Sequence, residues 1–126
     1  MKMQADRLDG SNAISRHGPD GVIVNGHEYR SSVIVPWTGA VARWPVASFE
    51  ALDEASFETL AALSPELVIF GSGSRLRFPK PGLLKPLMAR RIGFETMDTA
   101  AACRTYNVLL AEGRAVVAAL LFEAGL

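Results

Sequence analysis

The sequence is short of the residues that most often build metal sites and nucleophilic active sites. It contains one cysteine, Cys103, and two histidines, His17 and His27. A single cysteine cannot form an internal disulfide, which favours a reducing compartment. A zinc site needs several Cys or His ligands, so we expect no metal site and no cofactor. Both histidines lie far from Cys103 in the chain, and we interpret that cysteine as a small buried thiol.

Long apolar runs and a net charge are also lacking. The longest apolar run, residues 115–122, is far shorter than the roughly 20 residues that a membrane-spanning helix needs. Residues 1–10 carry no apolar stretch typical of a secretory signal. The 13 basic and 13 acidic residues cancel, which predicts no overall attraction to nucleic acid or to an anionic membrane, although local basic clusters remain possible. We therefore expect a cytoplasmic protein with no transmembrane segment and no nucleic-acid partner.

The chain contains enough apolar sequence for one folded domain. Its 126 residues are 49% hydrophobic and 21% charged, which is an ordinary globular composition. We expect an irregular N-terminal arm over residues 1–20, with at most a short strand at 13–16, and a single domain over residues 21–126. The Asn25-Gly26 pair between β-rich segments predicts a hairpin whose second strand covers residues 28–35.

The remaining two thirds of the chain alternates between helical and strand patterns. We predict helices over residues 49–63, 81–91 and 100–112, followed by strands over 66–70, 94–97 and 114–122, respectively. This alternation predicts right-handed crossovers and parallel strands. Ser56 is expected to cap the first helix, and Pro86 to lie in the first turn of the second. The buried face of the third helix is predicted to comprise Ala101, Ala102, Thr105, Val108 and Leu109.

A glycine-containing segment, Gly71-Ser72-Gly73-Ser74-Arg75-Leu76-Arg77, directly follows the predicted strand 66–70. Glycines at this position allow a sharp turn and the close approach of a ligand to backbone N–H groups. The two arginines could hold a phosphate or a carboxylate. The segment is not a dinucleotide-binding fingerprint, because Leu76 replaces the third glycine and the next helix begins only after Pro79. The alternative interpretation is a tight turn with solvated arginines.

The start of the third helix is expected to lie beside this turn. The carboxyl ends of parallel strands meet at one edge of a sheet, and ligands of open α/β sheets bind there. The helix N-terminus at Asp98 and Thr99 favours an anion, and Arg104 and Asn107 share one helix face. The alternative is that each of these residues has only a local structural role. The hypothetical ligand-binding residues are Gly71, Ser72, Gly73, Arg75, Arg77, Asp98, Thr99, Arg104 and Asn107; no catalytic residues are predicted.

Several segments follow one another in a fixed order: Val24-Asn25-Gly26 with Tyr29, Ser32 and Val33-Ile34-Val35, then Trp44, residues 65–73, Arg77-Phe78-Pro79, residues 97–100 and residues 105–109. In this order they resemble the Mth938-like family, a group of small domains of unknown function. The family turn is usually Gly-Thr-Gly, and Ser72 keeps the hydroxyl. The resemblance implies a three-layer α/β fold with a mixed, mostly parallel central sheet, flanking helices and an N-terminal β-hairpin.

The resemblance also implies a function class. The family includes a mitochondrial assembly factor of respiratory complex I, and it has no established catalytic residues. We therefore favour a non-enzymatic protein-interaction or assembly module, with another protein as its partner. The alternative is a domain or enzyme that binds a small anionic ligand in the crevice between Gly71–Gly73 and Asp98–Thr99. The sequence identifies neither the ligand, the partner nor the oligomeric state.

Overall fold

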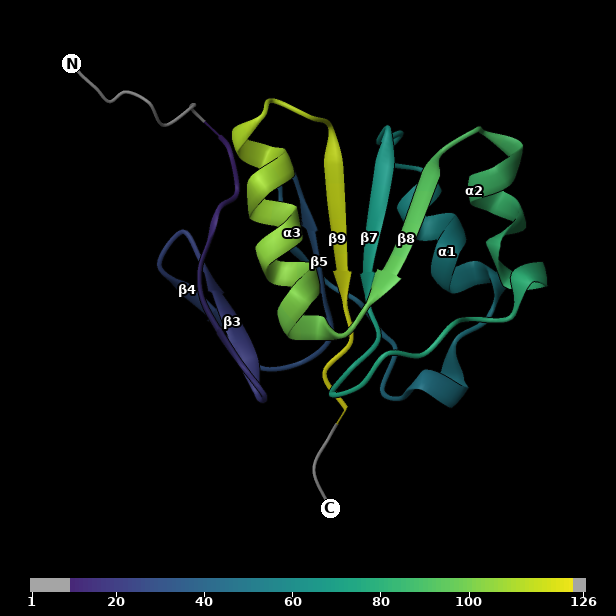
Figure 1. The fold of residues 1–126 in the computed structure, drawn as a ribbon, viewed down its shortest axis with the longest axis horizontal. Helices are drawn as coiled ribbons and strands as arrows, with labels where there is room; N and C mark the ends of the chain where they lie inside the picture. Colours follow the sequence, from purple (N-terminus) through teal and green to yellow (C-terminus); the bar gives the residue numbers. More distant parts are fainter. Residues whose placement is uncertain (1–9, 124–126) are drawn as a thin grey trace.

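A computed structural model describes residues 10–123 of the chain. These residues form a five-stranded mixed sheet in the order β6-β5-β9-β7-β8 and a three-stranded sheet in the order β2-β3-β4. Helix α3 and the three-stranded sheet cover one face of the larger sheet, and helices α1 and α2 cover the other (Figure 1). The predicted three-layer α/β architecture is confirmed.

The three-stranded sheet contains the predicted hairpin. Strand β3 (Gly21–Val24) pairs with β4 (His27–Tyr29), and the turn residues Asn25 and Gly26 have φ angles of 50° and 84°. These positive φ values are those of the two-residue turn that an Asn-Gly pair favours. Strand β2 (Ile14–Gly18) pairs antiparallel with β3, so the short strand expected at 13–16 is present and extends to residue 18, and this part of the predicted arm is not irregular. Residues 1–9 of that predicted arm lie outside the described residues.

The predicted return strand over residues 28–35 is divided between the two sheets. Strand β4 ends at Tyr29, and β5 (Val33–Pro36) pairs with β9 (Val116–Leu120) and β6 (Ala42–Arg43) in the larger sheet. All four residues of β5 are buried, whereas β4 is largely exposed. A continuously apolar segment suits a sheet that is covered on both faces, and this explains why residues 33–36 leave the hairpin.

The parallel part of the sheet is as predicted. Strand β7 (Leu67–Gly71) lies between β8 (Gly93–Met97) and β9 and is parallel to both. Gly71 aligns with Met97 on one side and with Leu120 on the other, so the three strands end together. Strand β5 pairs antiparallel with both of its neighbours, β9 and β6, and these two pairings make the sheet mixed.

Helices α1 and α2 begin later in the sequence than predicted, because each is preceded by a 3-10 turn. A 3-10 turn, η1 (Phe49–Ala51), precedes α1 (Glu54–Ala61). The N-cap is Asp53 rather than Ser56; the two residues form a reciprocal capping box in which Ser56 is the third helical residue. The 3-10 turn η2 (Pro81–Leu84) leads into the short helix α2 (Lys85–Ala89), with Pro86 in its first turn as predicted.

Helix α3 (Thr99–Ala111) begins at the predicted cap Asp98, and its buried face overlaps the predicted one only in part. Its buried residues are Thr99, Ala102, Cys103 and Tyr106. Of the predicted face, Ala102 is buried and Leu109 packs against the core, whereas Val108 is 57% exposed. The Tyr106 hydroxyl donates to the Asn12 carbonyl oxygen at 2.7 Å, and this partner lets the large aromatic side chain be buried. Cys103 is buried as expected, and desolvation raises the pKa of its thiol to about 12, which keeps the thiol protonated.

Alternate residues of the central strands pack into two separate cores. Along β9, Val116, Ala118 and Leu120 face α3 and the small sheet, whereas Val117 and Ala119 face α1 and α2. The second core contains a cluster of rings, here called the aromatic cluster: Trp44, Phe49, Phe57, Phe70 and Phe94. The sheet is therefore buried on both faces, as its apolar strands require.

Candidate functional site

The glycine turn and the start of α3 meet at the carboxyl ends of the parallel strands, as the topology predicts. The Ser72 N–H donates to the Met97 carbonyl oxygen at 2.8 Å, and the Thr99 N–H donates to the Gly73 carbonyl oxygen at 2.9 Å. The predicted crevice residues Gly71–Gly73 and Asp98–Thr99 therefore lie together.

The polar groups of the turn are used within the fold. Thr99 Oγ1 accepts from the Gly73 N–H at 2.8 Å and donates to the Leu121 carbonyl oxygen at 3.0 Å. Ser72 Oγ accepts from the Arg77 N–H at 3.0 Å and donates to the Arg75 carbonyl oxygen at 2.7 Å. The N–H groups of Ser72 and Gly73 thus already have protein acceptors and do not form an open cradle for an anion.

Gly73 has a structural reason to be glycine. Its φ angle is 103°, which other residues rarely adopt, and a Cβ atom there would lie 2.6 Å from Arg77 Nη2. A side chain at this position would force the Arg77 guanidinium to move. The second glycine of the turn is therefore explained by its positive φ angle, with no ligand required.

Arg77 is held by four groups of the protein. Its Nη2 and Nε atoms donate to the Ser72 carbonyl oxygen at 2.6 and 3.1 Å, and Nη2 also lies 2.7 Å from Glu123 Oε1. The guanidinium carbon is 4.6 Å from the centre of the Phe49 ring, within the range of a cation–π contact. Thr96 Oγ1 donates to the Arg77 carbonyl oxygen at 2.8 Å. Arg77 is thus largely neutralised and oriented inward, whereas Arg75 is exposed.

The two predicted site residues further along α3 are not part of the crevice. Asn107 accepts from the Ile14 N–H at 3.0 Å and donates to the Ile14 carbonyl oxygen at 2.7 Å, so it attaches β2 to the helix. Arg104 is exposed and does not border the cavity described below. Their i, i+3 spacing was a correct indication of a shared side of the helix, but that side does not face the glycine turn.

A cavity of about 360 Å³ borders the turn. Its lining includes Gly73, Asp98 and Thr99 from the predicted site, together with Gly18 and Pro19 from the β2–β3 turn. The segment 121–123 also lines it. Asp98 contributes a carboxylate that caps α3 by accepting from the Ala101 N–H at 2.9 Å. The helix N-terminus is therefore already occupied by a negative charge of the chain itself.

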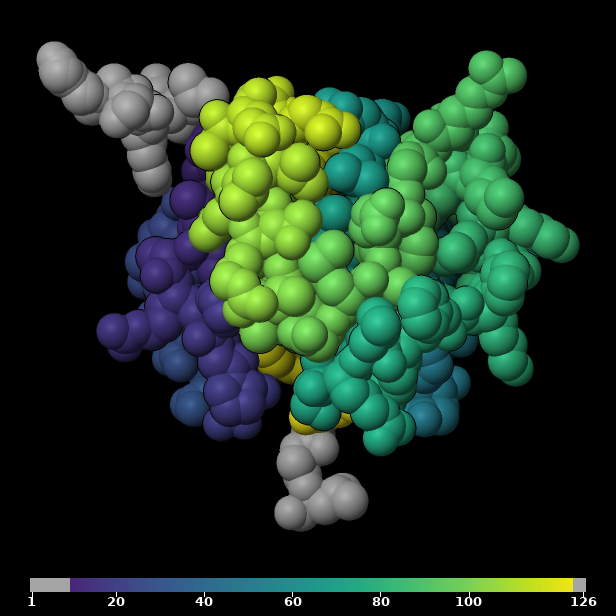
Figure 2. Space-filling view, in the orientation of Figure 1, coloured from purple at the N-terminus to yellow at the C-terminus, as the bar shows by residue number. Residues whose placement is uncertain are grey.

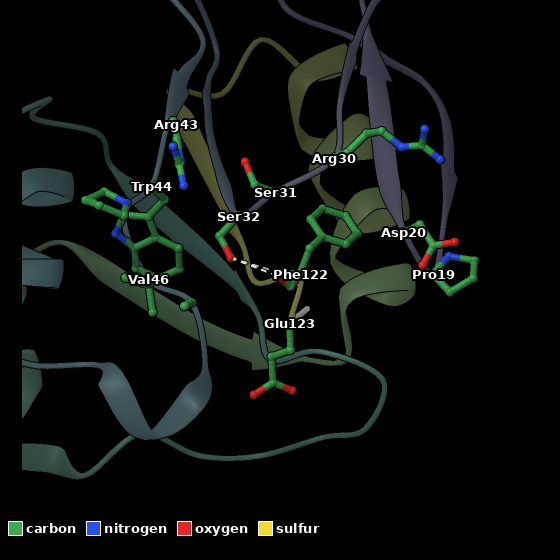
Figure 3. A pocket seen from close by; sticks show the side chains of 12 residues that line it. Pro19, Asp20, Arg30, Ser31, Ser32, Arg43, Trp44, Val46, Phe122 and Glu123 are labelled. Carbon is green, nitrogen blue, oxygen red and sulfur yellow. Dashed lines mark hydrogen bonds between the residues drawn. The ribbon is translucent and has the colours of Figure 1, made fainter. Parts of the chain in front are cut away.

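A larger cavity of about 510 Å³ lies where the two sheets meet, and local sequence patterns did not predict it. In Figure 3, Arg30 and Arg43 lie on either side of Ser31 and Ser32, and Ser32 is hydrogen-bonded to Phe122. Asp20 and Glu123 also line the cavity, so its charges are mixed. These residues come from four separate segments. No group of three or more His, Cys, Asp or Glu side chains within residues 10–123 is arranged to hold a metal ion.

The Glu123 ion pair predicts a pH dependence of stability. Burial raises the pKa of the Glu123 carboxyl, but hydrogen bonds from Arg77 and Phe49 and the charges of Arg77 and Arg75 outweigh it and lower that pKa below 4.5. A lowered folded-state pKa stabilises the fold above pH 4.5, and this contribution is lost as the pH falls through the folded-state value.

Urea unfolding between pH 7 and pH 3 tests this dependence. Glu123→Gln is expected to lose less stability on acidification than the unmodified chain, because its side chain cannot be protonated. Glu95→Gln, at an exposed position, is the control and should follow the unmodified chain. Identical losses of stability for the unmodified chain and Glu123→Gln would contradict the prediction.

Comparison with known proteins gives a consistent family assignment. The family model described as "Protein of unknown function (DUF498/DUF598)" matches residues 14–121. The chain is 34% identical over 111 residues to NADH dehydrogenase [ubiquinone] 1 alpha subcomplex assembly factor 3 of Bos taurus, covering 86% of this chain and 59% of the bovine protein. It is 33% identical over 123 residues to an uncharacterized protein of Rhodobacter capsulatus, covering 89% and 86% of the two chains.

Solved structures share the fold over nearly the whole chain. A crystal structure of a Bordetella parapertussis protein superposes with a TM-score of 0.86 at 36% identity, covering 93% of this chain and all of that one. A solution structure from Bordetella pertussis, described as an Mth938-like domain, has a TM-score of 0.83 at 30% identity and covers 98% and 94% of the two chains. The resemblance that the sequence segments indicated is confirmed.

Proposed function

Because this chain belongs to the DUF498/DUF598 family of Mth938-like domains, we propose that it is a non-enzymatic protein-interaction module that acts in the assembly of a respiratory NADH dehydrogenase. The observation that carries the proposal is the similarity to the bovine assembly factor across 86% of this chain. The chain spans about three fifths of that relative's length, at 59%. The proposed role is therefore one that the shared domain would perform.

The geometry of the candidate site supports a binding role over a catalytic one. A nucleophile needs a base within hydrogen-bond reach and access to substrate. The hydroxyls of Ser72 and Thr99 are instead bonded to backbone groups that close the turn. Cys103 is buried, and its thiol is kept protonated. Ser72 and Thr99 therefore stabilise the fold at the sheet edge, and Cys103 lies in the core, so none of the three presents a reactive atom.

The alternative, binding of a small anion in the crevice, has less support. The cavity beside Gly73 and Thr99 has room for a small ligand. However, the Asp98 carboxylate lines it and would repel an anion, and the other lining carboxylate, Glu123, is paired with Arg77. Of the two arginines that the sequence suggested for anion binding, Arg77 is already paired with Glu123, and Arg75 is exposed and does not line the cavity. The charge arrangement therefore favours the interaction module.

Deletion of the gene for this chain, together with affinity purification of the tagged chain at native expression, tests the proposed function. We expect less fully assembled NADH dehydrogenase on native gels after deletion, and recovery of its subunits or assembly intermediates with the tagged chain. An unchanged amount of assembled enzyme and no recovered subunit would contradict the proposal. Stabilisation of the purified chain by inorganic phosphate, lost in Arg75→Ala, would support the anion-binding alternative instead.

A further inference from the structure

The basic residues of this neutral chain are concentrated in one segment. Residues 71–94 contain six of the thirteen Lys and Arg residues and none of the thirteen Asp and Glu residues. The rest of the chain consequently has an excess of acidic residues. The net charge of zero, from which no attraction to an anionic membrane was predicted, does not show this separation of basic and acidic residues. A molecule with charges separated in this way is oriented by an external field even though its net charge is zero.

Four of these six cations are available at the surface. Arg77 is paired with Glu123, and Arg90 Nη1 donates to the Ala61 carbonyl oxygen at 2.8 Å. Each of the other four is exposed, and none of them forms an ion pair with another residue in the described part of the chain: Arg75, Lys80, Lys85 and Arg91. These four charges can therefore interact with an external anionic surface, although that of Arg75 also acts on Glu123.

The same segment exposes apolar side chains. Five large apolar residues within positions 10–123 are conspicuously exposed, and three of them lie here: Leu76 at 52%, Phe78 at 70% and Met88 at 67%. Leu76 and Phe78 flank the inward-pointing Arg77 in a stretch of chain that is neither helix nor strand. We call residues 75–91 the basic strip; it carries the four exposed cations and the three exposed apolar side chains, which are referred to below as its apolar tips.

The basic strip forms one margin of the molecule. In Figure 1 it runs from the end of β7 along the lower edge and then up through α2 at the far right, away from α3 and the small sheet. Figure 2 shows side chains projecting from this margin. The exposed cations and apolar side chains of the strip therefore lie along one margin of the fold.

We propose that the basic strip docks this protein on the surface of an anionic lipid bilayer. Clusters of four or more Lys and Arg side chains bind anionic headgroups, and neighbouring apolar side chains enter the boundary between headgroups and acyl chains. The chain would lie on the membrane rather than cross it: none of the helices in residues 10–123 has the length and apolar character that spanning requires.

The composition of the strip favours lipid over a protein partner. Interfaces between proteins have a contiguous apolar core and are depleted of lysine. Here single apolar side chains alternate with cations, and Lys80 and Lys85 lie between Phe78 and Met88. Flexible ammonium groups suit the diffuse charge of a bilayer, which needs no fixed bidentate geometry. The acidic remainder of the molecule is repelled by the same surface, and this orients the strip towards it.

Sedimentation of the 126-residue chain with vesicles tests the proposal. Vesicles of phosphatidylcholine alone are compared with vesicles that also contain phosphatidylglycerol. We expect binding only to the anionic vesicles, and weaker binding at high salt. The double variant Lys80→Glu/Lys85→Glu should bind at least about 25-fold more weakly, because each cation near an anionic bilayer contributes about fivefold. Phe78→Ala should bind about tenfold more weakly, because it removes an inserting ring.

Matched variants elsewhere on the surface are the controls. Arg16→Glu/Arg104→Glu changes the net charge equally at two exposed positions outside the strip, and Val108→Ala shortens an apolar side chain that is 57% exposed on α3. We expect both controls to bind nearly as well as the unmodified chain. No binding to anionic vesicles, or equal losses in the strip and control variants, would overturn the proposal. Binding to an acidic protein in the absence of vesicle binding would also overturn it.

Discussion

Replacing Phe70 with alanine is expected to lower the free energy of unfolding by about 3–5 kcal/mol, the usual cost of emptying a large aromatic site in a core. Phe70 is fully buried on β7 at the centre of the aromatic cluster. Its ring centroid lies 6.0 to 6.4 Å from those of four other rings: Trp44, Phe49, Phe57 and Phe94. Strand β7 is paired on both sides, so the backbone has little freedom to collapse into the resulting cavity.

Urea denaturation followed by tryptophan fluorescence measures this loss, because Trp44 makes an edge-to-face contact with Phe70. Phe78→Ala is the matched control. It deletes the same ring at a position that is 70% exposed, where a surface substitution changes stability by about 0.5 kcal/mol or less. If the two alanine variants lost similar amounts of stability, the assignment of Phe70 to the core would be contradicted.

Replacing Thr99 with valine is expected to cost about 2–6 kcal/mol, although the two side chains have nearly the same shape. The Thr99 hydroxyl joins the glycine turn to the end of β9 by accepting from the Gly73 N–H and donating to the Leu121 carbonyl oxygen. Both bonds are buried. Valine would leave one donor and one acceptor unpaired, and each such group costs about 1–3 kcal/mol.

The Thr99→Ser variant distinguishes the contribution of the hydrogen bonds to stability from that of the packed methyl group, because serine lacks the methyl. Serine retains the hydroxyl, so the serine variant should keep most of the stability in urea and retain slow hydrogen exchange of the Gly73 amide. The valine variant should show faster exchange at that amide, because its acceptor is removed. Equal unfolding midpoints for the serine and valine variants would be inconsistent with this account of the turn.

The glycine turn shows how far local sequence can predict a site. The order of strands and helices correctly placed Gly71–Gly73 beside Asp98–Thr99, because parallel strands must end at the same edge. The role of Arg77 could not be predicted in the same way. Its partner Glu123 lies 46 positions away in the sequence, and no local pattern associates the two. The motif that suggested anion binding is instead bonded within the protein.

The predictions that failed concern choices between competing long-range partners. Residues 33–36 leave the hairpin because β9 offers them a place in a sheet covered on both faces. The buried face of α3 overlaps the predicted one only in part, because the Tyr106 hydroxyl finds acceptors at Asn12 and Pro36, 94 and 70 positions away. Composition and spacing within the helix contain no information about those acceptors.

The sequence by itself determined the local and alternating features of this protein: the Asn25-Gly26 turn, the succession of helices and strands, and the parallel pairing that follows from it. These depend on backbone preferences and on hydrophobic periodicity, which are properties of short segments. Only the tertiary structure decided which side chains are used internally and which are free. In the folded chain Arg77 pairs with Glu123, Asn107 is bonded to Ile14, and the cations and apolar tips of the basic strip remain at the surface. Each of these outcomes depends on segments that are distant in the chain, so no short segment could predict it.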